Sequence, residues 1–243
     1  MNELRTKRRR RRRLVVVSLL LMVALGATVL FRNSLFHRNF GVVAQGLVYR
    51  AAQPEGNLKG LVEKYEVASI LNLRGGGSSD SFYENEVRLT SAKGIDFYDY
   101  PMNATRRPRR RDLLILIDLF QRCRYPLLIH CKSGSDRTGL ASGFYRMVRA
   151  GTPPEKALDS FSLYYGHVPL FGPENLHEPF HEYASWLKSQ GLAHSAERLR
   201  SWVENEYQAD DPRQEIQPLR SGPRAVLRTG LAGWTGPHQV IQP

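Results

Sequence analysis

The stretch from Pro126 to Gly139 constrains the fold more than any other part of the chain. It reads Pro-Leu-Leu-Ile-His-Cys-Lys-Ser-Gly-Ser-Asp-Arg-Thr-Gly. The apolar first half predicts a strand that is buried on both faces. The small residues after Cys131 predict a tight loop, and a helical pattern begins at Arg137. A strand, a loop and a helix in this order predict an α/β fold with a crossover at the loop.

The loop has the residue types that a phosphate site needs. Successive backbone N–H groups can point inward, and the N-terminus of the following helix adds partial positive charge. This environment also favours the thiolate of Cys131, which is the nucleophilic form. Arg137 can hold two phosphate oxygens in a bidentate fork. We therefore expect a phosphate to be surrounded by Lys132, Ser133, Gly134, Ser135, Asp136 and Arg137.

The pattern His130-Cys131-x5-Arg137-Thr138 resembles the phosphate loop of the cysteine-dependent tyrosine and dual-specificity phosphatases. Three further runs resemble a bacterial branch of that family: Tyr-Arg-Ala-Ala-Gln-Pro at 49–54, Ile-Leu-Asn-Leu-Arg at 70–74 and Tyr-Gly-His at 165–167. The resemblance covers about residues 46–185. It implies a cysteinyl-phosphate intermediate that water hydrolyses, a hydrogen bond from Thr138 to the sulfur, and no metal or other cofactor.

The general acid that protonates the leaving oxygen has more than one candidate. The resemblance implies an aspartate after the strand predicted at 95–102, and alignment of that strand places Ala104 at the expected position. Counting along the chain favours Asp99 instead, 32 residues before Cys131. Asp136 is the third candidate, because atypical bacterial tyrosine and lipid phosphatases have an aspartate directly before the loop arginine. We favour Asp136 over Asp99 as the acid.

Five arginines surround Pro108 in the segment 106–111. In the family such a segment lies near the substrate entrance, so the resemblance implies that these side chains recruit a polyanionic substrate. A solvated basic loop is the alternative. The residues that we expect to contact substrate are Arg74, Arg106, Arg107 and Arg109.

The N-terminus has the pattern of a membrane anchor. Residues 1–13 carry eight of the positive charges against one acidic residue, and residues 14–31 are uncharged and mostly apolar. As a helix those 18 residues would span roughly 27 Å, close to the thickness of a bilayer core. The basic arm predicts a cytoplasmic N-terminus, with the rest of the chain on the opposite, periplasmic or extracytoplasmic side. A cleaved signal peptide and a buried soluble helix are the alternatives.

Composition limits the remaining possibilities. Of the net charge of +12, the basic arm accounts for +7, so the charge of the whole chain does not indicate nucleic-acid binding. Two cysteines exclude a disulfide framework, and we expect Cys123 to be an ordinary core residue. Beyond the arm and the anchor, we expect a linker at 32–45, a phosphatase domain at 46–207 and a poorly ordered tail at 208–243. The alternation of strands and helices predicts an α/β domain with a mainly parallel sheet flanked by helices.

These observations predict a single-pass membrane phosphatase of a bacterial inner membrane. Its expected partners are a phosphorylated protein, or a phospholipid, as substrate. The absence of an aspartate at position 104 keeps a second hypothesis open, a pseudophosphatase that binds phosphorylated partners without turnover. A sulfur-transferring enzyme of the rhodanese type fits the Cys-x5-Arg-Thr pattern less well.

Overall fold

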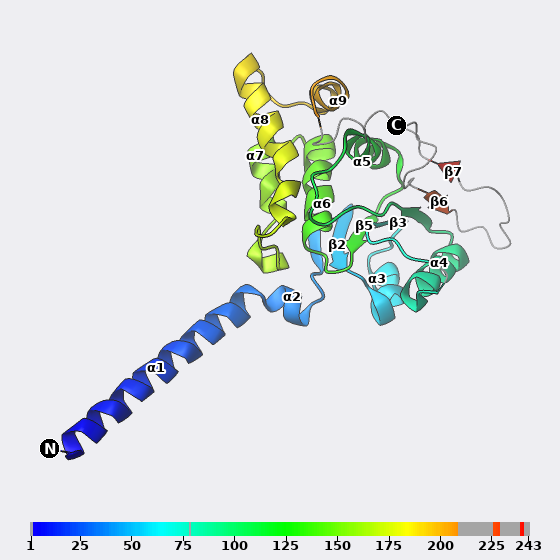
Figure 1. Ribbon diagram of the computed structural model, residues 1–243. Coiled ribbons are helices and arrows are strands. Elements are labelled where there is room, and N and C mark those ends of the chain that lie inside the picture. The colour runs from blue at the N-terminus through cyan, green and yellow to red at the C-terminus, as the bar shows by residue number, and fades with distance from the viewer. Residues whose placement is uncertain (1, 78, 209–225, 229–238, 241–243) are drawn as a thin grey trace.

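The computed structural model describes residues 2–77, 79–208, 226–228 and 239–240, and Figure 1 shows the arrangement of the elements. The strands are β1 (Gly41–Ala44), β2 (Val48–Ala52), β3 (Ser69–Asn72), β4 (Asp96–Asp99), β5 (Leu127–Cys131), β6 (Val226–Arg228) and β7 (Gln239–Val240). The α-helices are α1 (Asn2–Leu30), α2 (Arg32–Phe36), α3 (Leu58–Lys64), α4 (Ser81–Lys93), α5 (Arg110–Arg122), α6 (Asp136–Ala150), α7 (Pro154–Ala157), α8 (Glu178–Gln190) and α9 (Ala196–Asn205). Short 3₁₀ helices are η1 (Glu55–Asn57), η2 (Leu158–Ser160), η3 (Leu163–Tyr165) and η4 (Pro173–Leu176).

The sheet has the strand order β1-β2-β5-β3-β4-β6-β7. The four central strands are parallel to one another, whereas β1, β6 and β7 pair antiparallel at the edges. The strand β5 therefore lies between β2 and β3, with Cys131 beside Ala52 and His130 beside Asn72. Since parallel strands end at the same edge, the loop after β5 lies next to the ends of both neighbours.

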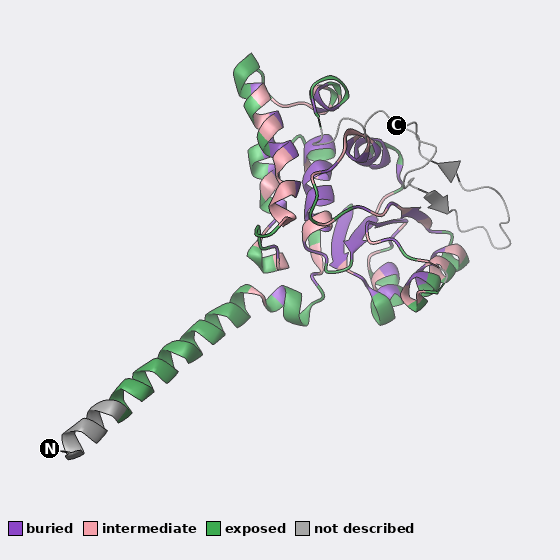
Figure 2. Ribbon diagram, viewed as in Figure 1, coloured by how far each residue is buried: buried purple, intermediate pink, exposed green. Residues whose placement is uncertain are grey.

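Helices cover both faces of the sheet, as Figure 1 shows. On one face lie α5 and α6, with α8 and α9 packed on these helices, and the core there includes Ile129 and Phe144. The other packs against α3 and α4 through a smaller core that includes Leu128 and Phe97. All five residues of β5 are buried, as Figure 2 shows, which explains why its sequence is an apolar run rather than an alternating one. The predicted α/β class and the mainly parallel sheet are confirmed.

Two boundaries differ from the sequence expectation. The strand expected over 95–102 is shorter, because Ile95 still caps α4 through a bond to Thr90 and Pro101 has no N–H for the ladder. Residues 32–45, expected as a linker, contain α2 and the edge strand β1, which pairs with β2. Most of the tail expected at 208–243 lies outside the described residues, so its order remains a prediction.

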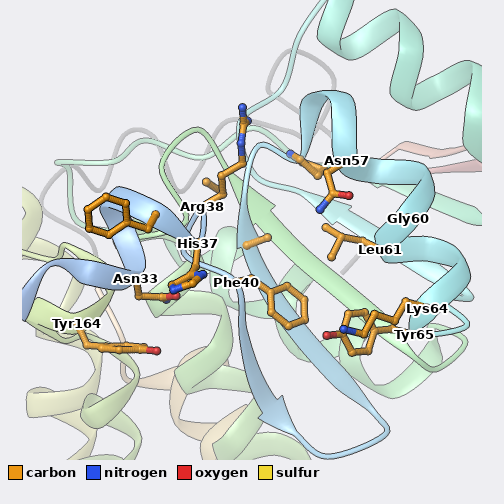
Figure 3. A pocket seen from close by; sticks show the side chains of 14 residues that line it. Asn33, His37, Arg38, Phe40, Asn57, Gly60, Leu61, Lys64, Tyr65 and Tyr164 are labelled. Atoms are coloured by element: carbon orange, nitrogen blue, oxygen red, sulfur yellow. The ribbon is translucent and has the colours of Figure 1, made fainter. Parts of the chain in front are cut away.

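The helix α1 projects from the domain (Figure 1), and its described side chains are exposed. Within the described chain, one helical segment, Arg10–Leu30, is long and apolar enough to cross a membrane. A signal sequence has the same length and composition, so the anchor and its orientation remain predictions. The short helix α2 follows directly, and together with β2 and α3 it surrounds a pocket (Figure 3).

Candidate active site

Cys131 ends β5 and is 1% exposed. Its sulfur accepts a hydrogen bond from the N–H of Gly134 at 3.3 Å, so the loop already curls around the thiol. Gly134 has a φ of +71°, and a Cβ there would lie 2.5 Å from the backbone nitrogen of Ala52. Only glycine fits this close approach of the loop to β2.

The loop is held from outside through four consecutive carbonyl groups. The N–H of Gln53 donates to Lys132, the Asn39 amide donates to Ser133 at 2.6 Å, and Arg50 donates to Gly134 at 2.9 Å and to Ser135 at 3.3 Å. A carbonyl that points outward leaves the neighbouring N–H groups directed to the inside of the curve. The loop therefore curves around the sulfur and leads into the N-terminus of α6, and its binding of an anion stays a prediction.

Arg50 is the internal support of this loop. It is 2% exposed, and its guanidinium also donates to the carbonyl of Ser160 at 2.6 Å and lies 3.7 Å from the ring centroid of Tyr165. Burial lowers the pKa of Arg50 to about 10, and nearby Tyr165, Cys131 and Asp136 oppose that shift. Arg50 thus remains a cation at neutral pH and joins the loop to the segment after α7.

Arg137 lies at the carboxyl ends of β3 and β4. Its Nη1 donates to the carbonyl of Leu73 at 3.0 Å and to that of Met102 at 3.2 Å. Its Nε is buried and has no hydrogen-bond partner among the described residues. The role of Arg137 in holding phosphate oxygens stays a prediction.

Thr138 does not form the hydrogen bond to sulfur that the resemblance implied. The hydroxyl is fully buried and has no hydrogen-bond partner within the described part of the chain. The sulfur is bonded by Gly134 instead.

His130 supports the loop from the other face of the sheet. Its Nε2 lies 2.7 Å from Oε1 of Glu86, and both side chains are almost fully buried. Oε2 of Glu86 accepts from Gln53 at 3.2 Å, and Arg74 donates to the same Gln53 at 3.4 Å. Arg74 also lies over the ring of Phe82 at 3.5 Å, so the structure gives it contacts inside the domain.

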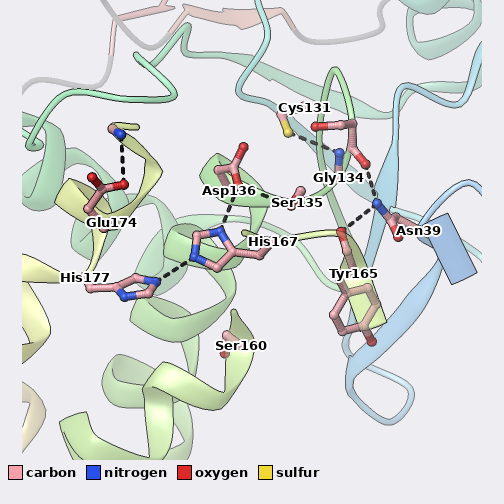
Figure 4. Close-up of polar contacts among 12 residues, drawn as sticks. Asn39, Cys131, Gly134, Ser135, Asp136, Ser160, Tyr165, His167, Glu174 and His177 are labelled. Atoms are coloured by element: carbon pink, nitrogen blue, oxygen red, sulfur yellow. Dashed lines mark hydrogen bonds and ion pairs between the residues drawn. The ribbon is translucent and has the colours of Figure 1, made fainter. Parts of the chain in front are cut away.

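Asp136 is the first residue of α6 and takes part in a chain of side chains that Figure 4 shows. Its Oδ1 lies 2.8 Å from Nδ1 of His167, and Nε2 of His167 lies 2.8 Å from Nε2 of His177. His167 is buried between Asp136 and the ring of Phe161. Burial, with His167 as the next cause, lowers the pKa of His177 to about 4. A neutral His177 can donate to His167, which can then donate to Asp136.

Asp99, the other acid candidate, lies elsewhere. It ends β4, which is separated from β5 by β3, so about 10 Å lies between the two backbones. Its carboxylate accepts a hydrogen bond from the hydroxyl of Tyr83 on α4. Ala104 follows β4 in a segment with no carboxylate until Asp112, which forms the capping box of α5 with Arg109. Asp136 is thus the candidate acid that lies in the loop itself.

The arginines of segment 106–111 do not form one surface. Arg107 is bonded to Glu182 at 2.6 Å and to the hydroxyl of Tyr207 at 3.2 Å. Arg109 pairs with Asp112 at 2.9 Å, and Arg110 donates to the carbonyl of Tyr207. Arg107 and Arg110 both contact Tyr207, whereas Arg109 contacts Asp112 at the start of α5. Arg107 and Arg109 therefore have internal partners, and Arg106 is the most exposed of the predicted substrate contacts.

Sequence reasoning did not assign a role to Arg50, Asn39, His167 or His177. Arg50 lies in the run 49–54 and His167 in the run 165–167, both of which resemble the family. Neither run showed which residues these side chains contact. Within the described residues, no group of three or more His, Cys, Asp or Glu side chains could hold a metal ion.

No family model matches the chain. A curated relative, inositol diphosphatase DSP1 of Oryza sativa subsp. japonica, is 28% identical over 119 residues, which are 46% of this chain. The chain spans about half the length of this curated relative.

Two solved structures are similar in fold. TpbA of P. aeruginosa in complex with pTyr is 18% identical, with 70% of this chain and 92% of that chain covered and a TM-score of 0.46. The catalytic core of the PP-IP phosphatase SIW14 from S. cerevisiae is 22% identical, with 63% and 93% covered and a TM-score of 0.47. The resemblance to cysteine-dependent tyrosine and dual-specificity phosphatases, first seen in the loop, agrees with the similarity to the curated inositol diphosphatase.

Proposed function

We propose that the chain is a membrane-anchored phosphatase that hydrolyses phosphomonoesters through a cysteinyl phosphate on Cys131. The observation that carries the proposal is the loop itself. Four consecutive carbonyls of the loop accept hydrogen bonds from outside it, and the N–H of Gly134 donates to the sulfur of Cys131. Phosphotyrosine or phosphoserine/threonine of proteins is the first substrate class, and anionic phospholipid headgroups are the second.

In the first step the sulfur of Cys131 attacks the phosphorus, and the bond from phosphorus to the ester oxygen breaks. The inward N–H groups and Arg137 stabilise the charge on the three other oxygens. Asp136 gives its proton to the leaving oxygen. In the second step water attacks the phosphorus, the P–S bond breaks, and Asp136 takes the proton from that water.

The contact with His167 supports Asp136 as the acid, because it fixes one carboxylate oxygen at the start of α6. Replacement of Asp136 by asparagine should lower kcat about 100-fold for phenyl phosphate, whose leaving group is poor. The effect should be less than tenfold for an aryl phosphate with an acidic phenol. The matched control is Asp99→Asn, which should show no dependence on the leaving group. The reverse pattern would show that Asp99 is the acid.

His167→Phe tests the support of Asp136, because it retains an aromatic ring beside Phe161 and removes both nitrogens. We expect it to reproduce part of the Asp136→Asn defect with the poor leaving group. His167→Asn, which can still donate to Asp136, should restore activity. If His167→Phe shows the same rate loss for both esters, the histidine serves only for packing.

The substrate class can be tested with the full chain in detergent micelles. The panel contains a phosphotyrosine peptide, a phosphoserine peptide, phosphatidylinositol phosphates and an inositol pyrophosphate. The last is included because the curated relative is named an inositol diphosphatase. Cys131→Ser serves as the blank. If the wild-type chain releases phosphate from none of the four substrates, the catalytic proposal is refuted.

The second candidate is a pseudophosphatase. It is favoured by the absence of a carboxylate at position 104 and by the unbonded hydroxyl of Thr138. Such a protein would bind phosphopeptides with the same affinity before and after Cys131→Ser and would turn none over. A burst of product release followed by turnover, in the wild-type chain alone, would exclude it.

A further inference from the structure

A pocket of about 780 Å³ lies between α2, the end of β2 and α3, and none of its lining residues belongs to the loop 131–137. Figure 3 shows the 14 side chains around it. The volume lies within the range of pockets that bind small organic ligands. Aromatic rings form much of the wall, contributed by Phe36, Phe40, Tyr65 and Tyr164.

The polar lining of the pocket is cationic. Arg38 and Lys64 line it from two different segments, together with His37, and the lining includes no Asp or Glu. The single carboxylate paired with Arg38 is Glu55 at 3.5 Å, and both side chains are more than half exposed. Such an exposed pair is weak and exchanges easily with another anion. The pocket therefore combines apolar rings with a basic rim.

Asn33 gives an independent indication of a ligand. It lines the pocket, is 2% exposed, and its Nδ2 has no hydrogen-bond partner among the described residues. A buried donor without an acceptor is unfavourable, and native proteins satisfy most such groups. The atom is closed to solvent in this side-chain position, so an oxygen atom of a ligand would supply the missing acceptor once the Asn33 side chain turns into the pocket.

The position of the pocket indicates where the ligand comes from. Asn33, Phe36 and His37 belong to α2 or follow it, and α2 is separated by one residue from the helix that is long enough to cross a membrane. Leu35 and Phe36 are 61% and 68% exposed. Exposed apolar residues and basic residues directly after a membrane span suit the interface of a bilayer, where anionic headgroups attract arginine and lysine.

We propose that this pocket binds one anionic phospholipid from the surrounding membrane as a bound ligand rather than as a substrate. The phosphate lies at the basic rim, a headgroup or ester oxygen accepts from Asn33, and the start of an acyl chain lies against the aromatic wall. The site adjoins the catalytic loop, because Asn39, next to Arg38, holds the carbonyl of Ser133.

The test measures lipid retention by the full chain with native mass spectrometry. Phosphatidylglycerol is the probe, because it is a phosphodiester and the proposed chemistry cannot consume it. Phosphatidylcholine of the same acyl composition and soluble glycerol phosphate are the comparison ligands. We expect one phosphatidylglycerol per chain, at least fivefold more retention than of phosphatidylcholine, and little binding of glycerol phosphate.

Lys64→Gln should lower the retention of phosphatidylglycerol about fivefold. Lys59→Gln is the matched control, since it removes the same charge from the same helix at an exposed residue that does not line the pocket. Asn33→Leu should also lower retention without any change of charge. The circular dichroism spectrum of Lys64→Gln, compared with that of the wild type, shows that the chain is folded.

Three results would overturn the proposal. Equal retention of both lipids would show that the charge of the headgroup is not recognised. Equal losses for Lys64→Gln and Lys59→Gln would indicate diffuse attraction to anionic lipid. Binding of glycerol phosphate as strongly as the lipid would indicate a site for soluble phosphate. None of these measurements depends on catalysis, so the proposed function can fail while the lipid site stands.

Discussion

Replacement of Arg50 by methionine removes the donor that holds two carbonyls of the catalytic loop while retaining much of the side chain's bulk. The variant loses hydrogen bonds to Gly134, Ser135 and Ser160 and the contact with the Tyr165 ring. Hydrogen bonds from a charged donor contribute about 1.5–3 kcal/mol each. The penalty for burying the cation, which lowers its pKa to about 10, offsets part of this gain.

The expected net loss of stability is about 3 kcal/mol, since removal of one partner leaves buried carbonyl groups unpaired. For a domain of this size that corresponds to a fall in Tm of roughly 6–12 °C. The loop N–H groups also lose their alignment, so kcat for an aryl phosphate should fall about 100-fold. Thermal unfolding in detergent, followed by intrinsic fluorescence, and steady-state kinetics measure the two effects.

Arg88→Met is the control, because Arg88 is exposed and its ion pair with Glu84 within α4 contributes only about 0.3–0.5 kcal/mol. Its Tm and kcat should match those of the wild type. Changes of less than about 2 °C in Tm and about threefold in kcat are close to the error of the two assays. If Arg50→Met causes only changes of that size, the reasoning is refuted.

Three further predictions concern single groups. Gly134→Ala places a Cβ 2.5 Å from the backbone nitrogen of Ala52, so kcat should fall about 100-fold while circular dichroism shows a folded chain. Burial raises the pKa of Cys123 to about 11, so at pH 8 iodoacetamide should alkylate Cys131 and spare Cys123, as peptide mass spectrometry would show. The pKa of His177, about 4 against an ordinary 6.5, means that its folded environment favours the neutral form. Its contribution to stability is complete above pH 6.5 and is lost as the pH falls toward 4, so His177→Asn should reduce the dependence of Tm on pH in that range.

The loop was predictable because its information is local. Its strand, its loop and its helix are contiguous, and the apolar run, the small residues and the arginine all lie within 14 residues. The order of the central strands follows less directly from the sequence than the loop does. The alternation of strands and helices was nevertheless enough to predict a mainly parallel sheet. The end of β4 and the start of α5 could not be placed from the sequence. Capping by Arg109 and Asp112 starts the helix before its apolar pattern begins.

The supports of the loop were not predictable, because they come from distant parts of the chain. Asn39 contacts a residue 94 positions away, and Arg50 contacts residues 84 and 85 positions away. Each looks like an ordinary polar residue in its own segment. For the arginines of segment 106–111, the sequence predicted a shared role instead of missing one. Adjacent in sequence, they suggested a basic segment that recruits a polyanionic substrate, yet Arg107 contacts Glu182 and Arg110 contacts Tyr207 inside the domain.

The position of Asn39 decides where the chain can be shortened. Its amide donates to the carbonyls of Ser133 and Tyr165, at 2.6 and 2.8 Å, so the segment before β1 clamps the catalytic loop to η3. A soluble fragment that begins at residue 46, the start suggested by the sequence resemblance, discards this clamp together with an edge strand. A fragment that begins at Arg32 removes the apolar helix and retains the clamp. The practical border of the catalytic unit therefore lies directly after α1.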